Sequence, residues 1–133
     1  MLAMLLTLTG CDLVGKTCNL MYAPDMLAVE ATRSEGWEGE LTVIAEGDGV
    51  TITCTILAGE TVSTCDNDGS SAELSGDTLS IFLWEFAPDT AELIFSIDAT
   101  EIAAESLAPA YDVDEPNGEG CGERRSATEI ITL

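Results

Sequence analysis

The sequence has no histidine and only four basic residues, which removes much of the chemistry that a chain of 133 residues could carry. Its one lysine, Lys16, lies close to the N-terminus, so neither a Ser–His nor a Ser–Lys pair is available to activate a nucleophile. Besides Lys16 the basic residues are Arg33, Arg124 and Arg125, against 25 acidic residues. The resulting net charge of −21 repels phosphate backbones and excludes nucleic acid as a partner.

We therefore expect no enzyme activity and no catalytic residues. A hydrolase that uses two carboxylates is the remaining catalytic alternative. With 25 acidic residues, however, some pair lies at a suitable separation by chance, and this signal carries little weight. Zinc is disfavoured as well, because the chain has no histidine and no two cysteines in a C-x-x-C spacing.

Long hydrophobic runs are also absent. Residues 1–10 (MLAMLLTLTG) are apolar and uncharged, but a membrane-spanning helix needs about 20 such residues. The short run ends before Asp12 and is typical of the hydrophobic region of a signal peptide. No Lys or Arg precedes the run, which departs from the usual signal peptide and predicts a true start codon further upstream.

The residues Leu8-Thr9-Gly10-Cys11 at the end of this run resemble the lipobox of bacterial lipoproteins. The resemblance implies cleavage before Cys11, a diacylglyceryl group on its thiol and an acyl chain such as palmitate on its new amine. Residues 1–10 would then be a cleaved signal peptide, residues 11–17 a lipidated tether and residues 18–133 the folded domain. Several acyl chains anchor a protein stably, so we expect the cell envelope, at the inner or the outer membrane and facing the periplasm or the exterior.

Four cysteines remain once Cys11 is set aside, and export would place them in an oxidising compartment. Three pairings are possible. Because Cys54 and Cys65 flank a short, turn-rich stretch, we predict that they pair with each other, which leaves Cys18 to pair with Cys121.

Alternating polar and apolar residues predict strands through most of the domain and no long helix. The clearest strand is 50–57, where threonines alternate with Val50, Ile52, Cys54 and Ile56. Other strands are expected at 27–31, 41–45, 78–86, 92–98 and 127–133, with a weaker one near 101–106, where one helical turn is the alternative. The sequence thus predicts a single antiparallel β-sandwich of about seven to eight strands. The segment 78–86 is apolar on both faces, so we expect a central strand covered on each side, with Trp84 in the core.

The C-terminal third carries Tyr111, Pro116, Asn117, Gly118 and Cys121, a Pro-Asn-Gly…Cys turn before the last strand. In this it resembles small myxobacterial-type lipoproteins, a resemblance that implies an immunoglobulin-like or transthyretin-like sandwich. Such proteins often have a further cysteine where this chain has Arg124 and Arg125, which is a departure from the pattern.

Two acidic turns are candidates for weak calcium binding, at Asp66-Asn67-Asp68-Gly69 and at 112–118. Calcium prefers flexible arrays of oxygen ligands, and Asp66, Asp68, Asp112 and Asp114 would supply them. Neither turn has the spacing of an EF-hand, and Asp, Asn and Gly are also the residues that turns themselves favour. No other cofactor is expected.

The function predicted from the sequence is that of an envelope lipoprotein without catalytic activity, acting as a structural or protein-interaction module. Its acidic surface would suit a basic protein or peptide. The alternative is a calcium-dependent adhesion or carbohydrate-binding module. In that case Trp37 could be an exposed platform for a sugar or a partner, although packing in the fold is the commoner role of a tryptophan.

Overall fold

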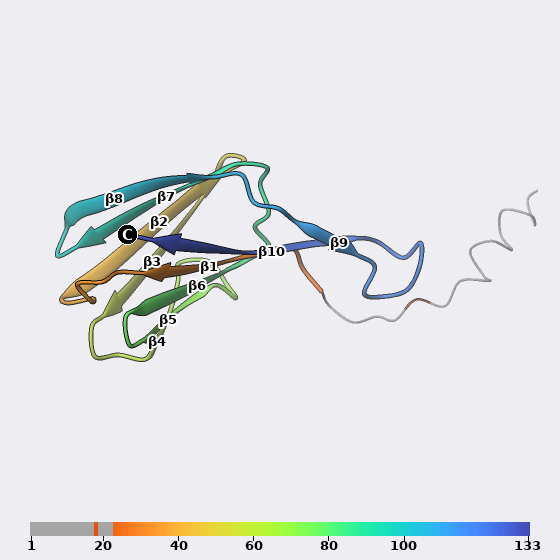
Figure 1. The fold of residues 1–133 in the computed structure, drawn as a ribbon. Coiled ribbons are helices and arrows are strands. Elements are labelled where there is room, and N and C mark those ends of the chain that lie inside the picture. The colour runs from red at the N-terminus through yellow and green to blue at the C-terminus, as the bar shows by residue number, and fades with distance from the viewer. Residues whose placement is uncertain (1–17, 19–22) are drawn as a thin grey trace, which may run out of the picture.

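The computed structural model describes residue 18 and residues 23–133, where the regular elements are all strands (Figure 1). They are β1 (Met26–Thr32), β2 (Glu40–Gly47), β3 (Val50–Leu57), β4 (Val62–Thr64), β5 (Ser71–Ser75), β6 (Thr78–Trp84), β7 (Ala91–Ile97), β8 (Thr100–Leu107), β9 (Asp112–Asp114) and β10 (Arg124–Thr132).

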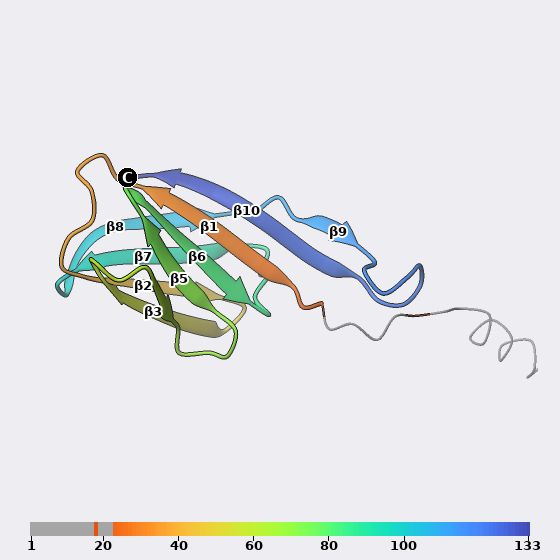
Figure 2. The ribbon, with the colours of Figure 1, turned by 90° about the horizontal axis from the view of Figure 1, so that it is seen from below.

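These strands form two sheets that lie face to face, so the predicted β-sandwich is confirmed (Figures 1 and 2). The six-stranded sheet has the order β4-β5-β6-β1-β10-β9, and the four-stranded sheet has the order β3-β2-β7-β8. Among the pairings of the named strands, β1 with β10 is parallel and the rest are antiparallel. Both β1 and β10 therefore begin at the same end of the sandwich.

One layer of inward-facing side chains fills the space between the sheets. It follows from the period of two along each strand, since alternate residues point to the same face. In β3 the inward residues Ile52, Cys54 and Ile56 are buried, as the sequence pattern predicts. Burial of this apolar surface is the main favourable contribution to folding. The largest side chains of the layer are Leu27, Leu41, Ile52, Ile56, Leu79, Ile81, Leu83, Leu93 and Phe95.

Three strands were not expected from the sequence: β4, β5 and β9. Two of them, β4 and β9, have three residues each, too few for an alternating pattern to be visible. The longer β5 does alternate, with Ala72 inward, but serine and glutamate on either side hide the signal. The weak segment near 101–106 is a strand, β8, and not a helical turn.

The end of the sandwich at which β1 and β10 begin carries the hairpin of β9 and β10, which projects beyond the four-stranded sheet (Figure 1). We call it the hairpin end. Cys121 lies in the loop of this hairpin and forms a disulfide with Cys18, with their Cα atoms 5.7 Å apart. The chain that precedes β1 is thus tied to this end, and the predicted pairing is confirmed.

The second predicted disulfide, between Cys54 and Cys65, is also present, with a Cα–Cα distance of 4.2 Å. Cys54 is 2% exposed, and it belongs to β3 of the four-stranded sheet, whereas Cys65 directly follows β4 of the six-stranded sheet. The bond therefore joins the two sheets along one side of the sandwich.

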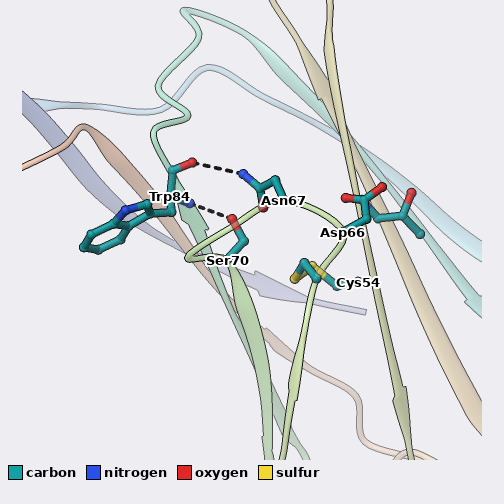
Figure 3. The surroundings of a disulfide bond; sticks show 7 residues. Cys54, Asp66, Asn67, Ser70 and Trp84 are labelled. Atoms are coloured by element: carbon teal, nitrogen blue, oxygen red, sulfur yellow. Dashed lines mark hydrogen bonds between the residues drawn. A yellow bond between two sulfur atoms is a disulfide. The ribbon is translucent and has the colours of Figure 1, made fainter.

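The loop of residues 66–70 continues this connection (Figure 3). Asp66 pairs with Thr53 of β3: its N–H donates to the Thr53 carbonyl at 3.0 Å, and its carboxylate accepts from the Thr53 N–H at 2.8 Å. Asn67 Nδ2 donates to the backbone carbonyl of Trp84 at 3.3 Å, and the backbone N–H of Trp84 donates to Ser70 Oγ at 2.8 Å. The loop thereby links β3 to the end of β6.

Trp84 corrects one sequence prediction. Leu79, Ile81 and Leu83 of β6 are fully buried between the sheets, but Trp84 has the opposite parity and is only half-buried on the outer face. Its ring lies against Gly69 of the loop. The outward residues of the segment are also apolar, which is why the sequence predicts cover on both faces. A loop, and not a further layer of structure, lies against the ring.

We predict that Gly69→Ala destabilises the domain more than Gly76→Ala. Both glycines have positive φ, +91° and +64°, but a Cβ at Gly69 would lie 2.6 Å from Trp84 Cγ, whereas a Cβ at Gly76 would meet nothing within 4 Å. The Gly76 variant therefore reports backbone strain alone, and the Gly69 variant should lose about 1–3 kcal/mol more from overpacking. Urea unfolding followed by tryptophan fluorescence measures both. Equal losses would show that the ring does not pack on this loop.

Candidate functional site: an acidic cleft at the hairpin end

Neither of the two predicted calcium loops forms a metal site among the described residues. In the first loop the Asp66 carboxylate is bonded to β3, and Asp68 is exposed. In the second loop, both carboxylate oxygens of Asp114 accept hydrogen bonds from Arg124, at 3.1 Å from Nε and 2.8 Å from Nη2. Asp112 is exposed on β9. Within the described residues no three Asp, Glu, Cys or His side chains form a group that could hold a metal ion. Calcium binding thus stays a prediction from the sequence.

Trp37 packs in the fold and is not an exposed platform. The residue is 8% exposed and belongs to the buried layer, with its ring centroid 6.4 Å from that of Phe95. Its indole N–H donates to the Asp77 carbonyl at 2.9 Å. The guanidinium of Arg33 lies over the ring, 6.0 Å from its centroid.

The basic residues of the described chain are all paired with its own carboxylates. Arg33 lies 3.6 Å from Glu35, Arg124 2.8 Å from Asp114, and Arg125 3.0 Å from Asp89. Lys16 and the predicted lipidation site Cys11 lie outside the described residues. These three pairs thus occupy all of the described arginines.

Arg125 has a second role at the hairpin end, because it also covers Tyr111 at 4.4 Å from the ring centroid. The Tyr111 hydroxyl donates to the Pro88 carbonyl at 2.8 Å. Burial, opposed by the charge of Arg125 and aided by the nearby carboxylates of Asp89, Asp48 and Glu129, raises the pKa of Tyr111 to about 12. The hydroxyl thus stays protonated at neutral pH and fixes the loop after β6 to the segment that follows β8.

The same end carries a row of four outward-facing residues that runs across the four-stranded sheet. Strand pairing aligns Thr51 with Glu46, Glu46 with Glu92, and Glu92 with Ser106. Residues directly opposite each other on one face have Cβ atoms about 4.5–5.5 Å apart, and like charges in such positions destabilise a sheet. Glu46 and Glu92 are both exposed and form such a pair.

This row is one wall of a cleft of about 460 Å³. The other wall is the turn between β2 and β3, where Asp48 and Gly49 both have positive φ, 51° and 75°, as a type I′ hairpin requires. Asp48 adds a third carboxylate, and Thr51, Thr90 and Ser106 add hydroxyl groups. The cleft offers hydrogen-bond acceptors and negative charge, which suit an ammonium or guanidinium group, and contains no pair of nucleophile and base.

The sequence alone does not reveal this site. Alternation along 41–45 placed Glu46 on the solvent side, but nothing in the sequence reveals that β2 lies beside β7. Only that pairing brings Glu46 opposite Glu92. The signal available in the sequence is that both glutamates lie on the solvent side near one end of a strand, a property that other glutamates of the chain share.

Comparisons with protein-family models, with curated proteins and with solved structures find no match to this chain. In the described part of the chain no helix is long and apolar enough to cross a membrane.

We predict that Glu46→Gln or Glu92→Gln stabilises the domain, because either change removes the repulsion between the two carboxylates. The gain should be about 0.2–1 kcal/mol at low salt and should shrink in 1 M NaCl, where charges are screened over about 3 Å. Glu30→Gln is the matched control, since Glu30 is exposed in β1 and has Ser80 and Ile130 as its neighbours across the sheet. Urea unfolding at both salt concentrations measures the effect. An equal gain from Glu30→Gln would show that general charge, and not this pair, is responsible.

Proposed function

We propose that the chain is an exported lipoprotein, cleaved before Cys11 and held in the cell envelope by acyl chains on that cysteine. We further propose that it acts without catalysis, as an interaction module for a basic protein or peptide. The lipobox-like Leu8-Thr9-Gly10-Cys11 supports the first part. The two disulfides support it independently, because such bonds persist in oxidising compartments.

The like-charge pair of Glu46 and Glu92 carries the second part of the proposal. A folded protein gains nothing from two exposed carboxylates side by side, and the described arginines are all occupied elsewhere. A basic ligand in the cleft would relieve this repulsion. The net charge of −21 would also steer basic partners toward the domain.

The disulfide of Cys18 also bounds the distance between the proposed anchor and the hairpin end. Cys18 lies seven residues after Cys11, and seven fully extended residues span about 23–25 Å at most. Because Cys18 is bonded to Cys121, the tip of the β9–β10 hairpin would stay within roughly this distance of the membrane surface. The cleft lies at the same end, so a partner would bind on the membrane side of the domain.

We predict that a ten-residue oligolysine peptide binds the oxidised protein and that its affinity falls as NaCl rises, since salt screens exposed charges. The double variant Glu46→Gln/Glu92→Gln should weaken binding about threefold to tenfold, as expected for the loss of two exposed ion pairs. The variant Glu30→Gln/Glu73→Gln removes the same charge from the outer face of the six-stranded sheet and should have a smaller effect. Titration by fluorescence anisotropy measures all three proteins. Equal weakening by the two variants would contradict a role for the cleft.

A further inference from the structure

The four-stranded sheet has one long edge that the described chain leaves open. β8 is its last strand and spans eight residues, Thr100–Leu107, paired with β7 on one side (Figures 1 and 2). On its other side no strand and no backbone hydrogen bond from the described residues is present. An open edge presents unpaired N–H and C=O groups and is a template for another strand.

The other edges of the described sandwich are shorter than β8 or occupied. β4 and β9 have three residues each. β3 is bonded to Asp66 through Thr53, and at its end the Leu57 N–H donates to Glu60 Oε1 at 2.8 Å. Within the described chain β9 pairs only with residues 124–126 of β10, so residues 127–132 are a second open edge, two residues shorter than β8. The segment after β8 approaches this edge, with the Ala110 N–H 3.4 Å from Glu129 Oε2. β8 is thus the edge of the described sandwich best suited to accept a strand.

The side chains of β8 restrict what can pair with it. Its centre is Ala103-Ala104, two small residues that leave the backbone accessible. Glu105 lies opposite Leu93, which is fully buried, so Glu105 points toward the space between the sheets. Glu129 of β10 points inward in the same way, since it pairs with the buried Val29. Neither carboxylate has an ion-pair partner in the described chain.

Inward-pointing charges on an edge strand oppose pairing with an ordinary apolar strand. The negative charge of the chain also opposes pairing with a second copy. Such a pair would bring Glu101 and Glu105 of two molecules together and join two net charges of −21. An added strand with lysine or arginine at inward positions would neutralise these carboxylates instead. The charge of the edge therefore selects a basic segment.

The acidic cleft favours the same occupant. Ser106 of β8 is the last residue of the row that contains Glu46 and Glu92. A strand added beside β8 would continue this row, about 4.8 Å beyond Ser106 and roughly 10 Å from Glu92. A lysine at that position could extend its long stem along the row toward the carboxylates.

We propose that β8 accepts an extended basic segment of a partner protein as a fifth strand of the four-stranded sheet. The backbone of this segment would pair with Thr100–Leu107, and its basic side chains would meet Glu105 on one face and the acidic cleft on the other. This inference rests on the proposed function and names the partner: a strand-forming basic segment, in contrast to any cation or unstructured polycation.

The test uses an eight-residue peptide of alternating lysine and valine, whose lysines all lie on one face of an added strand and would there meet Glu105, and two N-methylated twins of it. One twin carries N-methyl groups on the lysines and the other on the valines, so both keep the charge of the parent. In an added strand only one set of amides faces β8, since the N–H groups alternate in direction. One twin should therefore lose at least tenfold in affinity for the oxidised full chain, while the other binds like the parent. Hydrogen exchange should show new protection in Thr100–Leu107.

If the two twins bind with equal affinity, whether as tightly as the parent peptide or more weakly, strand addition is overturned. If the twins and oligolysine all bind alike, the acidic surface still binds basic partners and the proposed function stands without this inference. If neither oligolysine nor any of the three peptides binds, both this inference and the proposed role as an interaction module fail. The variant Glu105→Gln should weaken the parent peptide more than Glu30→Gln does, and sedimentation should show a monomer, since a dimer through β8 would also overturn the inference.

Discussion

The apolar layer buried between the two sheets holds the domain together against the self-repulsion of its acidic residues. The net charge is −21, because four basic residues cannot neutralise 25 acidic ones. The described ion pairs lie at the surface, where such pairs contribute little to stability. Stability must therefore come from apolar burial and from the two disulfides. The bond between Cys54 and Cys65 joins the sheets along one side, and the bond between Cys18 and Cys121 closes the hairpin end. Both act chiefly by restricting the unfolded chain.

The fold has few basic side chains to neutralise so acidic a surface, so we expect the neutralising charge to come from a partner outside the molecule. The like-charge pair of Glu46 and Glu92 lies next to the end of the open strand β8. The unpaired backbone groups of β8 and the carboxylates of the cleft thus lie side by side. A basic strand would hydrogen-bond to the first and neutralise the second. The proposed lipid on Cys11 would hold this same end of the molecule close to a membrane. Segments of other envelope proteins could meet the edge there at high effective concentration.

Much of this fold could be predicted from the sequence, because alternation along a strand is a local property. The strand at 50–57 was predicted correctly on that basis. Both cysteine pairs were also predicted correctly, because Cys54 and Cys65 flank a short turn-rich stretch and leave Cys18 for Cys121. What the sequence did not reveal depends on which strands lie beside one another. The pair of Glu46 and Glu92 exists only because β2 lies next to β7, and Trp84 is covered only because the 66–70 loop folds back on it. Likewise, that β8 is an edge strand depends on the order of the sheet.

The most direct test of the central claim, an exported, lipid-anchored and disulfide-stapled module, is the intact mass of the protein extracted from membranes after alkylation of free thiols. We predict the mass of residues 11–133 plus acyl chains, with no alkylation, since Cys11 would be lipidated and the four other cysteines oxidised. A full-length chain without lipid and with alkylated cysteines would contradict the account. In that case the acidic sandwich would belong to a reducing compartment, and the anchor at its hairpin end would not exist.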